Sequence, residues 1–167
     1  MLPNKMPQDL EQLIKEHNHE GVLSKQINAF DLFGNMQSEI IATPATIATT
    51  GNTDWYVIAP FSGVLVSVDF SGTTALATND TNYITFTITN LGQAGAGTTV
   101  MLSAVAGNTT KATGGVALAV NTKRSLIIST VINATLVGEG DRLLVRAAAT
   151  GTLANTVTFP TYLLKFK

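Results

Sequence analysis

Few side chains in this 167-residue sequence could carry out nucleophilic or acid–base chemistry. The chain has no cysteine, which excludes disulfides, thiol nucleophiles and cysteine-bound zinc. Its two histidines, His17 and His19, both lie near the amino terminus, so a Ser-His-acid triad cannot form within the residues that follow them. Side chains two positions apart on a helix point in different directions, so we expect a solvated helix end here and no metal site.

Paired carboxylates for glycoside hydrolysis would have to come from five acidic residues: Asp54, Asp69, Asp80, Glu139 and Asp141. Glu139 and Asp141 belong to a Gly-Glu-Gly-Asp sequence, which is typical of a tight turn. Asp80 could help to hold Ca²⁺, but one loop carboxylate with neighbouring amides is a small ligand set. The glycine-rich run 92–97 opens no helix and lacks the lysine of a phosphate-binding loop. A hydrolase using Asp69, Asp80 and Glu139 is the weakest hypothesis, and we predict no catalytic residue, metal or cofactor.

Two sets of residues in the second part of the chain could bind a partner. Arg142 and Arg146 are an even number of positions apart on one expected strand, so both should lie on the same face and could contact another subunit or pair across strands. Trp55 and Tyr56 could line a sugar-binding platform, although a single tryptophan at the start of a strand is more typical of a core. The loops near Asp80 and Asn108 are further candidates for ligand contacts.

The composition excludes several classes of protein. Only 13% of the residues are charged and the net charge is −1, which argues against disorder and against a strongly basic nucleic-acid-binding surface. No apolar run is long enough to span a bilayer, so we expect no membrane partner. A sparsely charged surface favours association, and we therefore expect part of it to be buried in a homo-oligomer or against a larger lattice.

The elements that carry these residues fall into two regions. Residues 1–38 form a charged arm with helix-favouring features, in which Leu10, Leu13 and Ile14 follow helical spacing after Pro7. A helix this short needs a docking partner. The residues that we expect to bind that partner are Leu10, Leu13, Ile14, Val22, Leu23, Ile27, Phe30 and Phe33.

Residues 39–167 change to a two-residue period with frequent turns, and we predict one mainly β domain there. In 83–89, Ile84, Phe86 and Ile88 alternate with threonine. In 65–70 we expect Val66, Val68 and Phe70 to face inward. The predicted strands are 39–47, 55–59, 63–70, 82–90, 100–105, 116–120, 125–131, 142–148 and 157–166. Eight or nine short strands without intervening helices predict an antiparallel β-sandwich, with a jelly-roll-like arrangement.

The first residues lack the apolar core of a secretory signal, while the body has the composition of an extracellular all-β protein. A virion protein, made in the host cytoplasm and then exposed on an assembled particle, satisfies both observations.

Three segments resemble β-sandwich structural proteins of tailed-bacteriophage heads. They are 55–70 (WYVIAPFSGVLVSVDF), 83–88 (YITFTI) and 137–145 (VGEGDRLLV). The resemblance covers about residues 40–167 and implies a decoration (cement) or head-fibre protein. Such proteins are often trimeric and lie on the outer capsid surface, so the implied partners are further copies of the chain and the major capsid protein.

The sequence therefore supports a non-enzymatic virion structural protein that decorates and stabilises a bacteriophage capsid as an oligomer, which the resemblance implies to be a trimer, with the arm as its attachment. The alternative is a head-fibre or tail-associated module that binds host glycans through Trp55, Tyr56, Asp80 or Asn108.

Overall fold

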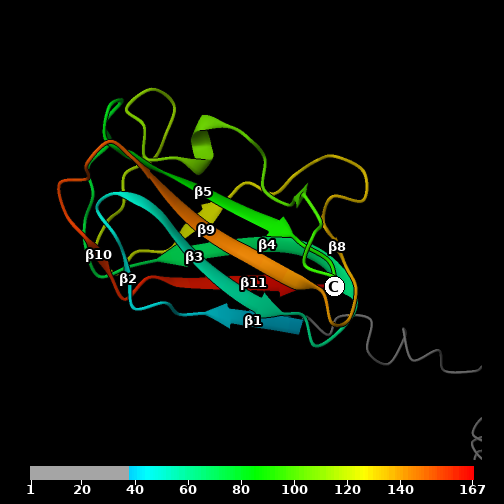
Figure 1. The fold of residues 1–167 in the computed structure, drawn as a ribbon. Coiled ribbons are helices and arrows are strands. Elements are labelled where there is room, and N and C mark those ends of the chain that lie inside the picture. The colour runs from blue at the N-terminus through cyan, green and yellow to red at the C-terminus, as the bar shows by residue number, and fades with distance from the viewer. Residues whose placement is uncertain (1–37) are drawn as a thin grey trace, which may run out of the picture. The chain divides into compact units, whose positions relative to one another are not determined.

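The structure, a computed structural model, describes residues 38–167, which belong to one compact unit (Figure 1). The predicted arm helix and the eight predicted docking residues of the arm lie outside the described residues. The strands are β1 (Ser38–Ala42), β2 (Thr46–Ile47), β3 (Gly51–Ile58), β4 (Gly63–Ser71), β5 (Tyr83–Asn90), β6 (Thr99–Val100), β7 (Arg124–Leu126), β8 (Leu136–Val137), β9 (Arg142–Thr150), β10 (Val157–Thr158) and β11 (Thr161–Phe166), with one 3₁₀ turn, η1 (Ala106–Asn108). The prediction of a mainly β body is confirmed.

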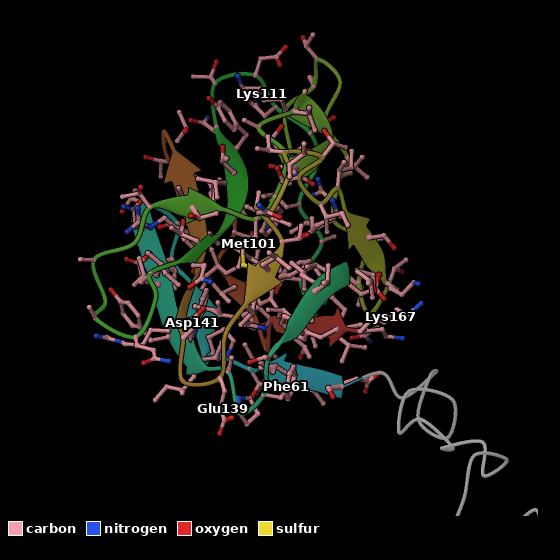
Figure 2. All side chains as sticks on the ribbon, turned by 90° about the vertical axis from the view of Figure 1, so that its right-hand side faces the viewer. Phe61, Met101, Lys111, Glu139, Asp141 and Lys167 are labelled. Carbon is pink, nitrogen blue, oxygen red and sulfur yellow. The ribbon has the colours of Figure 1, made fainter. Side chains whose placement is uncertain are left out.

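The strands form two main antiparallel sheets. One has the order β1-β11-β4-β7, with β8 paired to the start of β4, and the other has the order β3-β9-β5-β6. A small third sheet pairs β10 with β2. On one side the two main sheets are joined, because Met101 donates to Ile88 of β5 while Leu102 bridges to Ile128 beyond β7. Viewed from its end, the body shows Met101 between the two sheets (Figure 2).

Aromatic side chains from both sheets meet in the core. The Phe70 ring of β4 lies 4.8 Å from the Phe86 ring of β5 and 4.9 Å from that of Tyr162 in β11, measured between centroids. The alternation predicted for β5 is confirmed, since Ile84, Phe86 and Ile88 are all buried. Burial of these apolar side chains is the main force that holds the sheets together.

The expectation that Val66 faces inward is wrong. The register between β4 and β11 moves from Ser67 opposite Lys165 to Leu65 opposite Phe166, which leaves Val66 as an extra residue. A β-bulge of this kind interrupts the two-residue period. Leu65 is buried in its place, and Val66 is exposed.

Several predicted strands are shorter or interrupted. The predicted strand 39–47 divides into β1 and β2 around Pro44, and 157–166 divides at Phe159-Pro160, because proline has no N–H to donate to a ladder. The strands expected at 100–105 and 125–131 shorten to β6 and β7. No strand forms at 116–120, where only Leu118 makes a single bridge, to Leu76.

Because of Tyr162, we expect the free energy of unfolding to fall as the pH rises through the alkaline range. It is fully buried, its hydroxyl has no hydrogen-bond partner within residues 38–167, and burial raises its pKa above the usual value. The unfolded chain loses this proton near pH 10, whereas the folded chain keeps it. The stability linked to Tyr162 is therefore fully present below about pH 10 and is lost as the pH rises further.

We expect Tyr162→Phe to raise the free energy of unfolding by about 1 kcal/mol at pH 7, because it removes a buried hydroxyl without a partner. The advantage over the wild type should grow above about pH 10. Urea unfolding of both proteins at several pH values measures this. An identical pH dependence of the two proteins would contradict it.

Candidate functional site

The outer face of the β3-β9-β5 sheet carries four side chains that the sequence marks as candidates for chemistry or binding. They are Asp54, Tyr56, Arg142 and Arg146. Leu143, Val145 and Ala147 of β9 are buried, so Arg142 and Arg146 lie together on the opposite, outer face. Across the sheet, Asp54 of β3 aligns with Arg146, and Tyr56 aligns with Leu144. The strand register therefore places aromatic, aliphatic and charged groups on one surface.

Arg146 is held by a carboxylate of the neighbouring strand. Its Nε lies 2.7 Å from Asp54 Oδ1 and its Nη2 lies 2.8 Å from Asp54 Oδ2. The hydrogen bond to Asp54 raises the pKa of Arg146 above its usual value. This forked pair is partly exposed to water, so its contribution to stability is small. Its main effect is to neutralise the one charge on β3.

Arg142 lies against the exposed ring of Tyr56. The guanidinium carbon is 5.3 Å from the ring centroid, and Tyr56 is 55% exposed. A cation over an aromatic face at this distance contributes about 0.5–1 kcal/mol at an exposed site. The contact orients Tyr56 while leaving much of its ring open to a partner.

Trp55 and Tyr56 lie on opposite faces of β3. Trp55 packs toward the core, with its ring 5.8 Å from that of Tyr162. Successive side chains of a strand alternate between faces. The structure therefore does not bring these two aromatic residues together as one platform, and Tyr56 alone is presented outward.

The two loop candidates are held by structural hydrogen bonds. The Asp80 carboxylate accepts bonds from the Thr113 N–H (2.9 Å) and hydroxyl (3.0 Å), and these bonds lower its pKa. Asn108 is buried, and its side chain bonds to the carbonyls of Ser103 and Ile127 and to the Ile127 N–H. The donor and acceptor atoms of the Asn108 side-chain amide are therefore already bonded to main-chain groups.

The Asp141 carboxylate supports the turn that precedes β9. Asp141 Oδ2 accepts bonds from the Gly138 N–H and from Asn90 Nδ2, both at 2.8 Å, and Gly140 has a φ of +82°. This is the tight turn expected for Gly-Glu-Gly-Asp. Within residues 38–167, no three His, Cys, Asp or Glu side chains are grouped closely enough to hold a metal ion.

One pocket includes in its lining Asn108, which the sequence suggested as a ligand contact, but its other walls were not predicted. It has a volume of about 290 Å³ and lies between β5 and the 100–111 segment, where Val100, Leu102 and Val105 provide apolar walls and Lys111 provides a cation. Lys111 Nζ lies 4.6 Å from the Tyr83 ring centroid. No local motif marks this pocket, because its walls come from segments that meet only in the fold.

The sequence did not lead us to expect that Arg124 is buried. Arg124 is opposite Phe70 in the β4–β7 register and points inward. Its guanidinium donates to three carbonyls, those of Val116 (2.9 Å), Gly107 (2.8 Å) and Thr109 (2.8 Å). Burial lowers its pKa to about 10, so it remains charged at neutral pH. The only sequence signal was its position two residues before Leu126, in the inward phase of β7.

The fold and this surface define a class no finer than a mainly β protein with two antiparallel sheets. No family model, curated protein or solved structure matches the chain. In the described part of the chain, no helix has the length and apolar character needed to cross a membrane.

Proposed function

We propose that this protein is a non-enzymatic structural protein of a bacteriophage virion, which decorates and stabilises the outer surface of the capsid as a homo-oligomer. In this proposal the body is a jelly roll and the arm attaches it to the major capsid protein. Synthesis takes place in the host cytoplasm, before the protein joins the particle.

The strand order is the observation that carries the proposal. Three strands lie outside the two main orders, since β8 pairs only with the start of β4 and β2 and β10 pair with each other. The two sheets contain the other eight strands in the chain orders 1-8-3-6 and 2-7-4-5. A jelly roll is a double sheet of eight strands formed by two Greek keys, and it is used by viral capsid and lectin domains. This order supports the jelly roll and, with the resemblance of 55–70 to phage-head proteins, a virion role.

The exposed apolar side chains support an assembled state. Ile58 is 66% exposed and adjoins Tyr56 on β3, while Val131 and Ile132 are 69% and 87% exposed before β8. Apolar surface of this kind marks interaction sites when it is contiguous. A protein that works within an oligomer on a lattice would cover such surface.

Capsid stabilisation would follow from mass action. A subunit that binds only the assembled lattice adds RT ln(1 + [L]/Kd), about 2.7 kcal/mol per site at a hundredfold excess over Kd. No catalytic group is needed for this effect.

Removing residues 1–37 tests the attachment. This deletion keeps Ser38, with which β1 begins. The truncated protein should remain folded and oligomeric but should no longer sediment with purified expanded capsids, because the docking residues of the arm are gone. A second variant keeps the full chain and changes Leu10, Leu13 and Ile14 to serine. It should also bind more weakly than the wild type. Undiminished binding by the truncated protein would refute the arm as the anchor.

Glycan recognition is a second candidate, favoured by the exposed ring of Tyr56 beside Arg142. In this case the protein would be a head-fibre or tail-associated module. A glycan array with the wild type and Tyr56→Ala separates the two proposals. Binding that Tyr56→Ala abolishes would favour the module, and an array without binding would reject it.

A further inference from the structure

One edge of β3 has no partner strand within residues 38–167, and it leads to an inference that goes beyond capsid decoration and does not depend on it. We propose that β3 pairs with β3 of a second copy, antiparallel about a two-fold axis. The pairing joins the two β3-β9-β5-β6 sheets into one continuous sheet. The partner is a second copy of this chain.

The hydrogen-bond pattern shows which main-chain groups of β3 are open. Leu91, just after β5, donates to the Arg142 carbonyl at 2.8 Å, so Arg142 directs its main-chain groups toward β5. Directions alternate along a strand, and the odd-numbered residues of β9 therefore bond to the odd-numbered residues of β3. Asn52, Asp54, Tyr56 and Ile58 consequently direct their N–H and C=O groups away from β9. Within residues 38–167 these groups have no main-chain partner.

This edge lacks the features that normally prevent strand pairing. Short length, lysine, proline and bulges protect sheet edges. β3 has eight residues in unbroken register with β9, and it contains neither lysine nor proline. Its one charge, on Asp54, is neutralised by the forked bond to Arg146. The strand is therefore a long, uncharged template at the front of the body in Figure 1.

The other sheet edges are better protected. β1 has five residues, with Glu39 3.7 Å from Lys165, and β6 has only two. The end of β7 is already bridged, through Ile128, to Leu102. Among the described strands, β3 thus offers the longest open edge.

Self-pairing satisfies this edge completely in one register. When Asp54 of one copy lies opposite Tyr56 of the other, Asn52 lies opposite Ile58, and all four open residues of each copy exchange both main-chain bonds. The two-fold axis makes the contact isologous, so the same residues serve both copies. The exposed side chains of Tyr56 and Ile58 then lie beside the partner strand and lose contact with water.

The pairing predicts an even number of copies. An isologous edge contact is used up once two copies have joined, so it produces a dimer or an assembly of dimers. The resemblance to phage-head proteins implied a trimer instead. The mass of the full chain in solution therefore separates this interface from a three-fold one, whether or not the protein binds capsids.

Light scattering on the full chain, with Tyr56→Pro and Tyr56→Thr as variants, tests the interface. Proline at 56 removes an N–H that points to the open edge, which an edge strand tolerates. Threonine keeps that N–H and removes only the ring. We expect a dimer for the wild type and for Tyr56→Thr, and a dissociation constant raised roughly a hundredfold or more for Tyr56→Pro.

Amide hydrogen exchange on the wild type tests the same interface without a variant. At dimer concentrations the amides of Asn52, Asp54, Tyr56 and Ile58 should be protected, and on dilution they should exchange quickly. The amides of Thr53, Trp55 and Val57, bonded to β9, are internal controls and should stay protected throughout. Fast exchange of the four edge amides at every concentration, or a trimer mass that Tyr56→Pro leaves unchanged, would overturn the inference.

Discussion

Arg124→Met should lower the free energy of unfolding by about 3–5 kcal/mol, because it removes a donor from three main-chain carbonyls, and within residues 38–167 only that of Thr109 keeps another, the Val116 N–H at 2.9 Å. These are the carbonyls of Val116, Gly107 and Thr109, and all three accept bonds from the one guanidinium. The guanidinium carbon also lies 5.1 Å from the Phe86 ring centroid, so the cation contacts the core directly. Methionine keeps an unbranched stem but offers no donor.

The neighbouring residue provides a matched control. The Lys123 side chain is 69% exposed and reaches Asp69 only at 3.5 Å. Exposed pairs of this kind contribute little, so Lys123→Met should change stability by no more than about 0.5 kcal/mol. Denaturant unfolding of the two variants measures the difference. Equal stabilities would mean that the carbonyls find other partners and that Arg124 does not hold its segments in place.

Phe70→Ala should lower the free energy of unfolding by about 3–5 kcal/mol, since it removes one of the large side chains that join the two sheets. Phe70 contacts Phe86 of the opposite sheet and Tyr162 of its own, and both of these rings are themselves buried. Thermal or denaturant unfolding measures the loss.

Phe159→Ala is the corresponding control. Phe159 is 72% exposed in the turn between β10 and β11, so its removal should alter stability by less than about 0.5 kcal/mol. A loss at Phe70 as small as that at Phe159 would show that the sheets do not depend on this contact.

The local patterns of the sequence predicted the regular parts of the fold. Alternation identified β5, and even spacing placed Arg142 and Arg146 on one face. The Gly-Glu-Gly-Asp sequence predicted the turn before β9. Each of these depends on neighbours within a few positions along the chain, so no knowledge of the remaining fold was needed.

The predictions that were wrong depend on segments that lie far apart in the sequence. Val66 faces outward because of a bulge against β11, a strand almost a hundred residues away in the chain. Val116 and Val120 looked like strand residues, but their segment finds only the single bridge between Leu118 and Leu76. A period read along the sequence cannot show whether a second strand is available to pair.

The candidate interaction surface was likewise predicted in part from the sequence, while the rest of it depended on the fold. The sequence singled out Tyr56, Arg142 and Arg146, but it also grouped Trp55 with Tyr56, which the strand places on opposite faces. The forked pairing of Arg146 with Asp54 joins residues 92 positions apart and needed the register of β3 with β9. Asn108 proved to be a buried support for main-chain groups.

By itself, the sequence determined that the body is mainly β, that it lacks cysteine and histidine after residue 38, and where its main strands and turns fall. Only the tertiary structure decided which edge stays open, which arginine is buried and which aromatic ring meets solvent. The physical reason is that strand periods and turns are set by steric and hydrogen-bonding preferences of adjacent residues, whereas edges, bulges and buried charges depend on which distant segments supply the partners.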